Sequence, residues 1–246
     1  MVSKRTRQVG IVTQARMGST RLPGKILLSA ANKPLLAYHI QRLLWSNLPV
    51  YVATTDQEAE TPILQFCTQY SLPVYRGGEQ DVLARFYEAA CYFKLDVIVR
   101  VTSDCPLIDG HLIQEGLQMF SASPAEKKYL SNSLERTFPR GFDFEIFSFE
   151  LLKEAYEHAS HQYEREHVTP YMYLRNLPDV QLISFKQAQD QSRYRITLDV
   201  PEDYELIKRL IAEHHAEDMN HIQITGILEA NPDLSDINSH VEQKKL

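Results

Sequence analysis

The stretch VGIVTQARMGSTRLPGK, residues 9–25, decides the fold class. It begins with four apolar or small residues that are typical of a buried strand, and it continues into a loop of small residues and cations. Arg16, Arg21 and Lys25 lie in that loop together with two glycines, a serine and a threonine. A buried strand that runs directly into such a loop is typical of an α/β protein, in which ligands bind beyond the carboxyl ends of the strands. We therefore expect the loop to bind an anion.

The rest of the chain alternates short β-branched runs with longer segments of helical periodicity. We expect strands at 8–13, 50–54, 97–101, 142–147, 180–185 and 194–198. We expect helices at 34–46, 57–70, 80–93, 110–121, 148–158, 163–175 and 201–214. Such alternation predicts an α/β fold with a mostly parallel, Rossmann-like sheet and helices on both faces. We predict one domain over 1–246, with a small lobe around 129–147 over the site and a polar tail at 231–246.

Composition excludes several classes of protein. The formal net charge of −6 argues against a general nucleic-acid binder, which usually carries a basic excess. Three widely spaced cysteines form no C-x-x-C pair, which disfavours a zinc site of that kind and a disulfide framework. No run approaches the about 18 apolar residues of a membrane span, and the apolar run behind the basic N-terminus is too short for a signal peptide. We expect a cytoplasmic protein that binds neither nucleic acid nor membrane.

The loop after the first strand matches neither of the two common phosphate-binding motifs. Five residues separate Gly18 from Gly24, and Ile26 follows Lys25, so the P-loop pattern G-x-x-x-x-G-K-[ST] is absent. The dinucleotide pattern G-x-G-x-x-G is absent as well. The backbone amides of Gly18 and Ser19 could still form an anion nest. A solvated basic loop with a Pro-Gly turn is the alternative.

Carboxylates follow two other strands of the predicted sheet. Asp104 lies in TSDCPLID, three residues beyond VIVRV, and Asp199 follows YRITL. Mg²⁺ prefers one or two carboxylates together with substrate phosphates, so the loop cations and these acids together predict a metal–phosphate site. Asp109 precedes a helical run and is better interpreted as its N-cap.

The other acids leave alternatives open. Pro201 suits the first helical turn, which places Val200 at the N-cap and leaves Asp199 one position early, so ligand and capping roles are equally favoured. Asp81 either reaches a ligand from a helix start or belongs to the first turn, where Arg85 could pair with it. The single E-x-x-H spacing of Glu164 and His167 favours a polar helix over a metal cluster.

Eight segments of the chain, taken in order, resemble the spore coat polysaccharide biosynthesis protein F family. The segments are QARMGSTRLPGK, NKPLLAYHIQRL, VYVATTD, VYRGGEQDVLARFYEAA, VIVRVTSDCPLID, RTFPRGFDFEIFS, YEREHVTPY and ITLDVPEDYELI. This family is similar to the cytidylyltransferases that make CMP-activated acidic sugars, such as the CMP-Kdo and CMP-sialate synthetases. The resemblance implies a fold of the nucleotide-diphospho-sugar transferase type.

The resemblance also implies roles for individual residues. Those implied to bind the nucleotide are Gln14, Ala15, Arg16, Gly18, Ser19, Arg21, Lys25, Asp81, Thr102 and Ser103. The implied catalytic residues are Arg16, Lys25, Asp104 and Asp199, of which the two aspartates are also the implied metal ligands. The residues implied to bind the sugar are Asn132, Arg140, Asp143, Glu145, Glu166 and His167. One position departs from the pattern, because Thr102 stands where some relatives have a second acidic metal ligand.

The expected function is therefore Mg²⁺-dependent transfer of CMP from CTP to an acidic or modified sugar, with release of pyrophosphate. Arg140 is expected to grip a sugar carboxylate, and His167 to orient or deprotonate the attacking hydroxyl. The resemblance implies a homodimer. Two alternatives stay open: a non-catalytic nucleotide-binding module of the same fold, and a glycosyltransferase, although no D-x-D pair stands at a strand end. The sequence does not identify the sugar, and the choice of CTP over other nucleotides rests on the resemblance.

Overall fold

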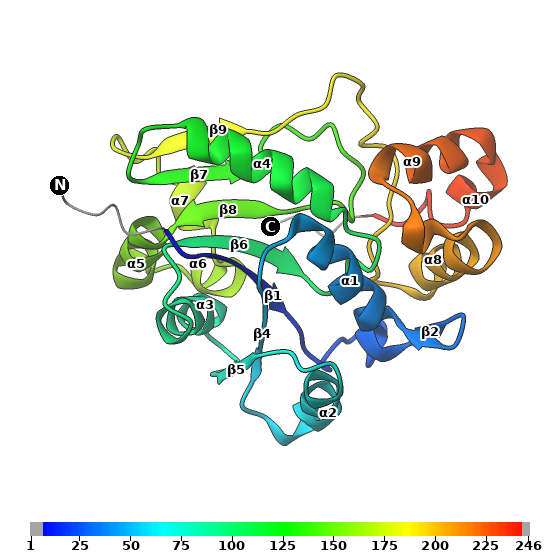
Figure 1. The fold of residues 1–246 in the computed structure, drawn as a ribbon, viewed down its shortest axis with the longest axis horizontal. Helices are drawn as coiled ribbons and strands as arrows, with labels where there is room; N and C mark the ends of the chain where they lie inside the picture. Colours follow the sequence, from blue (N-terminus) through cyan, green and yellow to red (C-terminus); the bar gives the residue numbers. More distant parts are fainter. Residues whose placement is uncertain (1–6, 243–246) are drawn as a thin grey trace.

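The computed structural model describes residues 7–242 and has a seven-stranded sheet at its centre (Figure 1). The strand order is β5-β4-β1-β6-β8-β7-β9. Its strands are β1 (Val9–Gln14), β4 (Val50–Thr55), β5 (Val74–Gly77), β6 (Val97–Thr102), β7 (Lys128–Ser131), β8 (Glu145–Ser148) and β9 (Gln181–Ser184). Only β8 runs antiparallel to its neighbours, so the prediction of a mostly parallel sheet is confirmed. A small two-stranded ladder joins β2 (Ser29–Ala30) to β3 (Lys33–Pro34).

Helices cover both faces of the sheet, because successive residues of its central strands point to opposite sides. Ile11 and Val12 of β1 are both fully buried, yet they belong to two different hydrophobic clusters. One cluster includes α1 (Leu35–Leu43), α2 (Thr61–Gln69), α4 (Gly110–Ala122) and α8 (Pro201–His214). The other includes α3 (Val82–Tyr92), α5 (Phe149–His158) and α7 (Pro170–Leu174). The apolar strands therefore lie inside the molecule on both faces.

Two predicted elements differ from the structure. The segment 194–198 is extended but forms only an isolated bridge between Arg140 and Arg195, because it lies against a loop and not against another strand. The predicted helix at 163–175 is divided into α6 (Gln162–His167) and α7. It breaks because Val168 has a positive φ of 72° and Pro170 has no backbone N–H to continue the helix. The segment 129–147 supplies β7, β8 and the loop between them, and its two strands are part of the main sheet.

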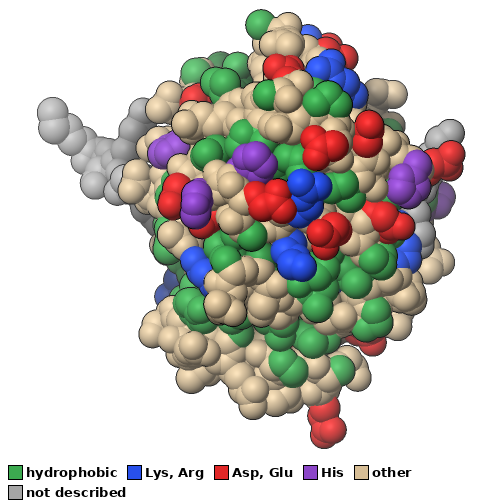
Figure 2. All heavy atoms as spheres, turned by 90° about the vertical axis from the view of Figure 1, so that its right-hand side faces the viewer, with side chains coloured by type: hydrophobic (Ala, Val, Ile, Leu, Met, Phe, Trp, Pro, Cys, Tyr) green, Lys and Arg blue, Asp and Glu red, His purple; other side chains and the backbone are tan. Residues whose placement is uncertain are grey.

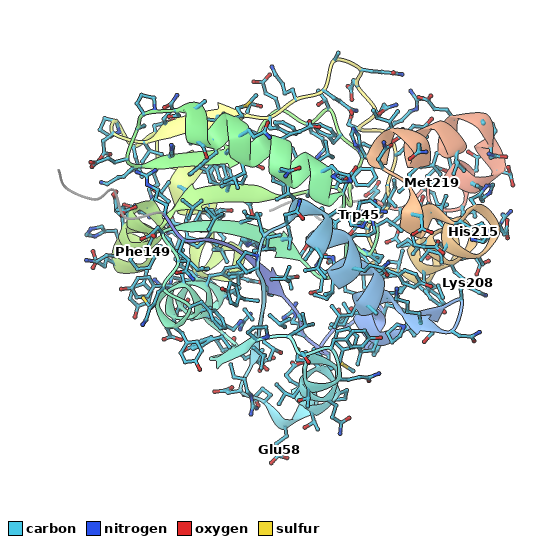
Figure 3. The ribbon with its side chains drawn as sticks, viewed as in Figure 1. Trp45, Glu58, Phe149, Lys208, His215 and Met219 are labelled. Carbon is cyan, nitrogen blue, oxygen red and sulfur yellow. The ribbon has the colours of Figure 1, made fainter. Side chains whose placement is uncertain are left out.

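The C-terminal part of the chain is more structured than its polar composition indicates. It forms α9 (His221–Ala230) and α10 (Pro232–Asp236), and Leu234 is buried. Arg42 of α1 ties this part to the body, since its guanidinium donates to the carbonyls of Ala216, Glu217 and Met219 and stacks over Trp45. Trp45 and Met219 mark this seam in Figure 3. On the side that bears the C-terminal helices, acidic and basic side chains are interspersed (Figure 2).

Candidate active site

Lys25 lies between two aspartates that are far apart in the sequence. Its Nζ is 3.0 Å from an Asp104 carboxylate oxygen and 2.8 Å from an Asp199 oxygen. Arg21 approaches the second Asp199 oxygen at 3.4 Å. The structure thus brings the predicted loop cations and the predicted acids to one place. We call Lys25, Asp104 and Asp199, with the Arg195–Asp203 pair behind them, the aspartate cluster.

The loop that carries Lys25 is closed by backbone hydrogen bonds. The amide of Gly24 donates to the carbonyl of Met17 at 3.1 Å, and Gly24 has a φ of 65°, a conformation that glycine adopts at little cost. The amide of Met17 donates to the Glu60 carboxylate at 2.8 Å. A short 3₁₀-helix, Lys25–Leu27, follows at once. The tight turn at Gly24 therefore directs Lys25 back toward the ends of the strands.

Asp199 is oriented by a second ion pair beneath it. Arg195 donates to Asp199 at 3.0 Å and grips Asp203 through two nitrogens, at 2.8 and 2.9 Å. Asp203 also accepts the amides of Asp199 and Val200, as expected of an acid in the first turn of α8. The predicted N-cap at Val200 is confirmed, so Asp199 stands just outside the helix with its side chain directed at Lys25.

The segment before Asp199 is fastened directly to Asp104. The carbonyl of Asp104 accepts the amide of Leu198 at 2.8 Å and the hydroxyl of Thr197 at 3.2 Å. These bonds replace the ladder that a regular strand would have formed at 194–198. They fix the separation of the two carboxylates, because each one lies within one residue of a bonded backbone group.

The charges of the aspartate cluster reinforce one another. Burial by itself would raise the pKa of Asp104, but the charge of Lys25 and the hydrogen bonds from Thr102 and Lys25 together lower this pKa. Burial would likewise lower the pKa of Lys25, yet Asp104 and Asp199 raise it. The Asp104 carboxylate and the Lys25 ammonium therefore stay ionised together at neutral pH.

Comparisons with known proteins show which family this chain belongs to. The sequence pattern of the cytidylyltransferase family matches residues 9–233. The chain belongs to the cytidylyltransferase family. Spore coat polysaccharide biosynthesis protein SpsF of Bacillus subtilis is 32% identical over 234 residues, which cover 90% of this chain and 94% of that protein. A cytidylyltransferase from Leptospira borgpetersenii superimposes with a TM-score of 0.89 at 32% identity, covering 98% of this chain and 100% of the other.

A more distant structure shares the fold alone. CMP:2-keto-3-deoxy-manno-octonic acid synthetase in complex with CTP superimposes with a TM-score of 0.61 at 19% identity, covering 84% of this chain and 99% of the other. The predicted class of enzyme, a nucleotidyltransferase of the cytidylyltransferase type, is confirmed by the family match. No helix within residues 7–242 of this cytidylyltransferase is long and apolar enough to cross a bilayer.

The aspartate cluster fits a divalent cation that depends on its substrate for further ligands. Carboxylate oxygens of Asp104 and Asp199 already converge on one cationic group, the Lys25 ammonium. Among the described residues no set of three or more His, Cys, Asp or Glu is grouped to hold a metal ion. Two carboxylates are what Mg²⁺ uses when nucleotide phosphates and waters complete its shell.

A cavity of about 290 Å³ opens beside the end of β6 in this cytidylyltransferase. Thr102 at its wall is two residues from Asp104. Its charged side chains form two ion pairs, Arg100 with Glu145 and Arg136 with Asp143, the second at 2.5 Å. We call it the His167 cavity. Its lining comprises Arg100, Val101, Thr102, Ser133, Arg136, Asp143, Phe144, Glu145, His167, Thr169 and Tyr173.

The backbone beside the His167 cavity is strained. Val168 has φ 72° and ψ −55°, and the amide of Thr169 donates to the carbonyl of His167 at 2.8 Å, which together make a γ-turn of the rare left-handed form. Val168 is fully buried, while the residues on either side of it line the cavity. Burial lowers the pKa of His167, partly opposed by Glu166, so the imidazole is neutral at pH 7. Strain of this kind is concentrated at functional sites.

The other residues of the first loop are arranged around its closure. Ala15 is buried and donates its amide to Ala53, while the carbonyl of Gln14 accepts the amide of Ser103 at 3.0 Å. Arg16 is exposed, and nothing lies within 4 Å of a Cβ placed on Gly18. The hydroxyl of Ser19 accepts the amide of Leu22 at 3.3 Å. Their predicted contacts with a nucleotide stay predictions.

Three predicted binding residues have structural partners instead of facing the aspartate cluster or the His167 cavity. The hydroxyl of Ser103 is buried against Thr13. The Asn132 amide is fully buried and joins the carbonyl of Phe142 to the amide of Phe144. Of the two alternatives for Asp81, the structure shows the helix-start role: Asp81 caps α3, and it also pairs with Arg165. The suggested partner Arg85 donates to the carbonyl of Gly78 instead.

Arg140 and Glu166 do not line the His167 cavity, and their predicted contacts with a sugar stay predictions. Arg140 lines a separate cavity of about 120 Å³ with Arg193 and Arg195, and not the His167 cavity. Arg136, four residues earlier, lines the His167 cavity in its place. Glu166 is exposed and acts on His167 through its charge. Glu164, the acid of the E-x-x-H spacing, pairs with Arg175 at 2.7 Å, which favours the polar helix.

The sequence analysis did not identify four residues of these sites. Two of them, Arg100 and Arg195, had a signal in the sequence, and two had none. Arg100 had a visible signal, since it is a single cation in the apolar run VIVRV, and a buried cation needs a carboxylate partner. Arg195 had a weaker signal, because its position four residues before Asp199 marks a neighbour only in a helix, and the segment is extended. Arg136 and Tyr173 gave no signal, since only the folded structure brings them to the cavity.

Proposed function

We propose that this chain transfers CMP from CTP to a hydroxyl of an acidic or modified sugar, with Mg²⁺ as cofactor and with release of pyrophosphate. The observation that carries the proposal is the convergence of Asp104 and Asp199 on Lys25 at the end of the sheet. The family match and the SpsF relative, whose name refers to spore coat polysaccharide biosynthesis, support the nucleotide and the sugar.

In this proposal Asp104 and Asp199 hold Mg²⁺, which when bound would polarise the phosphates. Lys25 then exchanges its two carboxylate partners for phosphate oxygens, and Arg21 and Arg16 lie on the same loop to offset charge on the leaving pyrophosphate. In this scheme the rate of nucleotidyl transfer comes from positioning and charge stabilisation, because the protein forms no covalent bond to the nucleotide.

We assign the acceptor sugar to the His167 cavity. It lies at the same end of β6 as Asp104, and hydroxyl, guanidinium and imidazole groups line it, which suits a polyhydroxylated ligand. The imidazole of His167 has a lowered pKa, so it is able to accept a hydrogen bond from the attacking hydroxyl.

A two-stage assay tests this function. The first stage measures the thermal shift produced by CTP, UTP and GTP with Mg²⁺, since a ligand of the folded state raises its apparent stability. The second measures pyrophosphate release with CTP and a panel of sugar acids, in the native protein and in Asp104→Asn. We expect CTP to give the largest shift and Asp104→Asn to lose about 100-fold in rate. A larger UTP or GTP shift would overturn the nucleotide, and near-normal turnover in Asp104→Asn would overturn the metal assignment.

A further inference from the structure

A fully buried histidine lies directly behind Asp104. His39 of α1 is 0% exposed, and its Nδ1 is 2.8 Å from the carbonyl oxygen of Cys105. Its Nε2 is 2.8 Å from the Thr13 hydroxyl, and that hydroxyl is 2.9 Å from the hydroxyl of Ser103. The imidazole therefore contacts one residue that flanks Asp104 directly and reaches the other through Thr13.

The hydrogen bonds run in series from Ser103 through Thr13 and His39 to the carbonyl of Cys105. That carbonyl fixes the direction of each bond in the series. A carbonyl oxygen only accepts, so His39 donates from Nδ1 to Cys105. Burial lowers the pKa of His39 to about 4, so the ring is neutral and Nε2 carries no proton. Nε2 then accepts from the Thr13 hydroxyl, and the Thr13 oxygen accepts from Ser103. One tautomer satisfies all of these groups, and reversing any bond would leave a buried group unpaired.

We infer that His39 is a positioning residue for Asp104, holding the loop 103–105 so that the Asp104 carboxylate faces the cation and the phosphates of the nucleotide. The inference rests on the proposed function. His39 does not touch the ligand in this scheme. It acts through the backbone of Cys105 and the side chain of Ser103, on both sides of the carboxylate.

The remaining bonds of the loop show why this support matters. The Asp104 backbone is fastened on one side, where its carbonyl accepts from Leu198 and Thr197. The Asp104 side chain is 26% exposed and pairs with Lys25, which in the proposed function exchanges partners when CTP binds. Once Lys25 has moved, the hydrogen bonds of His39 still hold the side of the loop next to α1, while the Ser103 amide stays on Gln14 and the Asp104 carbonyl stays on Leu198 and Thr197.

The experiment compares CTP affinity with and without Mg²⁺, by calorimetry, in the native protein and in His39 variants. His39→Leu removes both hydrogen bonds at similar volume. His39→Asn keeps a donor near the Nδ1 position for the Cys105 carbonyl. Thr225→Val removes another buried hydroxyl, one that donates to His221 in α9, and serves as the control for a general loss of stability.

We expect Mg²⁺ to raise the CTP affinity of the native protein and of Thr225→Val at least about 10-fold, which is 1.4 kcal/mol. In His39→Leu the enhancement should fall to less than about 3-fold while the affinity without Mg²⁺ stays within about 2-fold, and in His39→Asn at least half of the enhancement should return.

Three results would overturn the inference, and they are distinguishable. A folded His39→Leu variant that keeps the full Mg²⁺ enhancement shows that His39 does not position Asp104. A loss of CTP affinity in His39→Leu that is equal with and without Mg²⁺ shows a general structural role. A native protein that binds CTP without any Mg²⁺ enhancement, or does not bind CTP, contradicts the proposed function as well, and the native measurement reveals this before any variant is made.

Discussion

The aspartate cluster and the His167 cavity hold their charges in different ways. In the aspartate cluster one ammonium, that of Lys25, is shared between two carboxylates. In the His167 cavity each guanidinium pairs with one carboxylate. The Glu145 carboxylate also accepts hydrogen bonds from the hydroxyls of Tyr129 and Thr169, so we call its pair closed. A shared cation can exchange partners when a ligand arrives, whereas a closed pair keeps its shape. The first arrangement suits a site that receives highly charged phosphates, and the second suits a site that recognises shape and hydroxyl groups.

The largest expected effect is on the shared cation. Lys25→Met should lower kcat/KM about 1000-fold, because one positive charge directed at developing negative charge is lost in a water-poor site. Steady-state pyrophosphate release measures this loss. Lys33→Met provides a matched control on an exposed lysine of the same region, and it should stay within about 2-fold. If Lys25→Met and the native protein have equal CTP affinity and rate, Lys25 does not exchange its aspartate partners for phosphate oxygens.

The closed pairs make a prediction about stability. Glu145→Gln leaves the partly buried guanidinium of Arg100 without its carboxylate and should cost about 3 kcal/mol in the free energy of unfolding, measured with urea. Glu157→Gln breaks the exposed pair with Lys153 and should cost less than about 0.5 kcal/mol. If the two variants are equally stable, Glu145 is not a structural anchor and the contrast between the two regions is lost.

The pH dependence of stability tests whether His39, which supports the aspartate cluster, is buried as a neutral group. The pKa of His39 is about 4 in the folded protein, against about 6.5 when it is unfolded, so the unfolded chain binds a proton first as the pH falls. His39 by itself should therefore account for a loss of about 3 kcal/mol of stability between pH 6.5 and pH 4. His39→Asn should show a shallower decline over that window. Urea unfolding across this pH range measures both curves, and parallel curves would argue that His39 is not buried as a neutral group.

The smallest expected effect tests the strained turn of the His167 cavity. Val168→Gly and Val168→Ala both lose buried methyl groups, but only glycine relieves the positive φ. We expect Val168→Gly to be at least as stable as Val168→Ala, by up to about 1 kcal/mol, by thermal unfolding. In helix α3, Ala89→Gly should show the ordinary opposite sign and cost about 1 kcal/mol. A Val168→Gly variant that is the less stable of the two would contradict the presence of strain.

The two regions also differ in how far the sequence predicted them. The first loop, Asp104 and Asp199 could be found because each follows an apolar run, and the ends of parallel strands meet at one edge of a sheet. The sugar-side residues stay predictions: Arg140 lines a separate cavity, and Arg136 is the arginine of that loop that lines the His167 cavity. The orientation of a loop depends on contacts with distant segments, which spacing along the chain does not encode.

The sequence by itself determined the α/β class, the parallel strands and the identity of the charged groups at their ends, because periodicity and burial follow directly from residue type. Only the tertiary structure decided that Lys25 bridges two aspartates, that Arg195 and Asp203 orient one of them, and that His39 supports the loop of the other. These contacts join residues as far apart as 174 positions, and each exists only when several elements have packed. The same packing holds Val168 in a conformation that its own side chain disfavours.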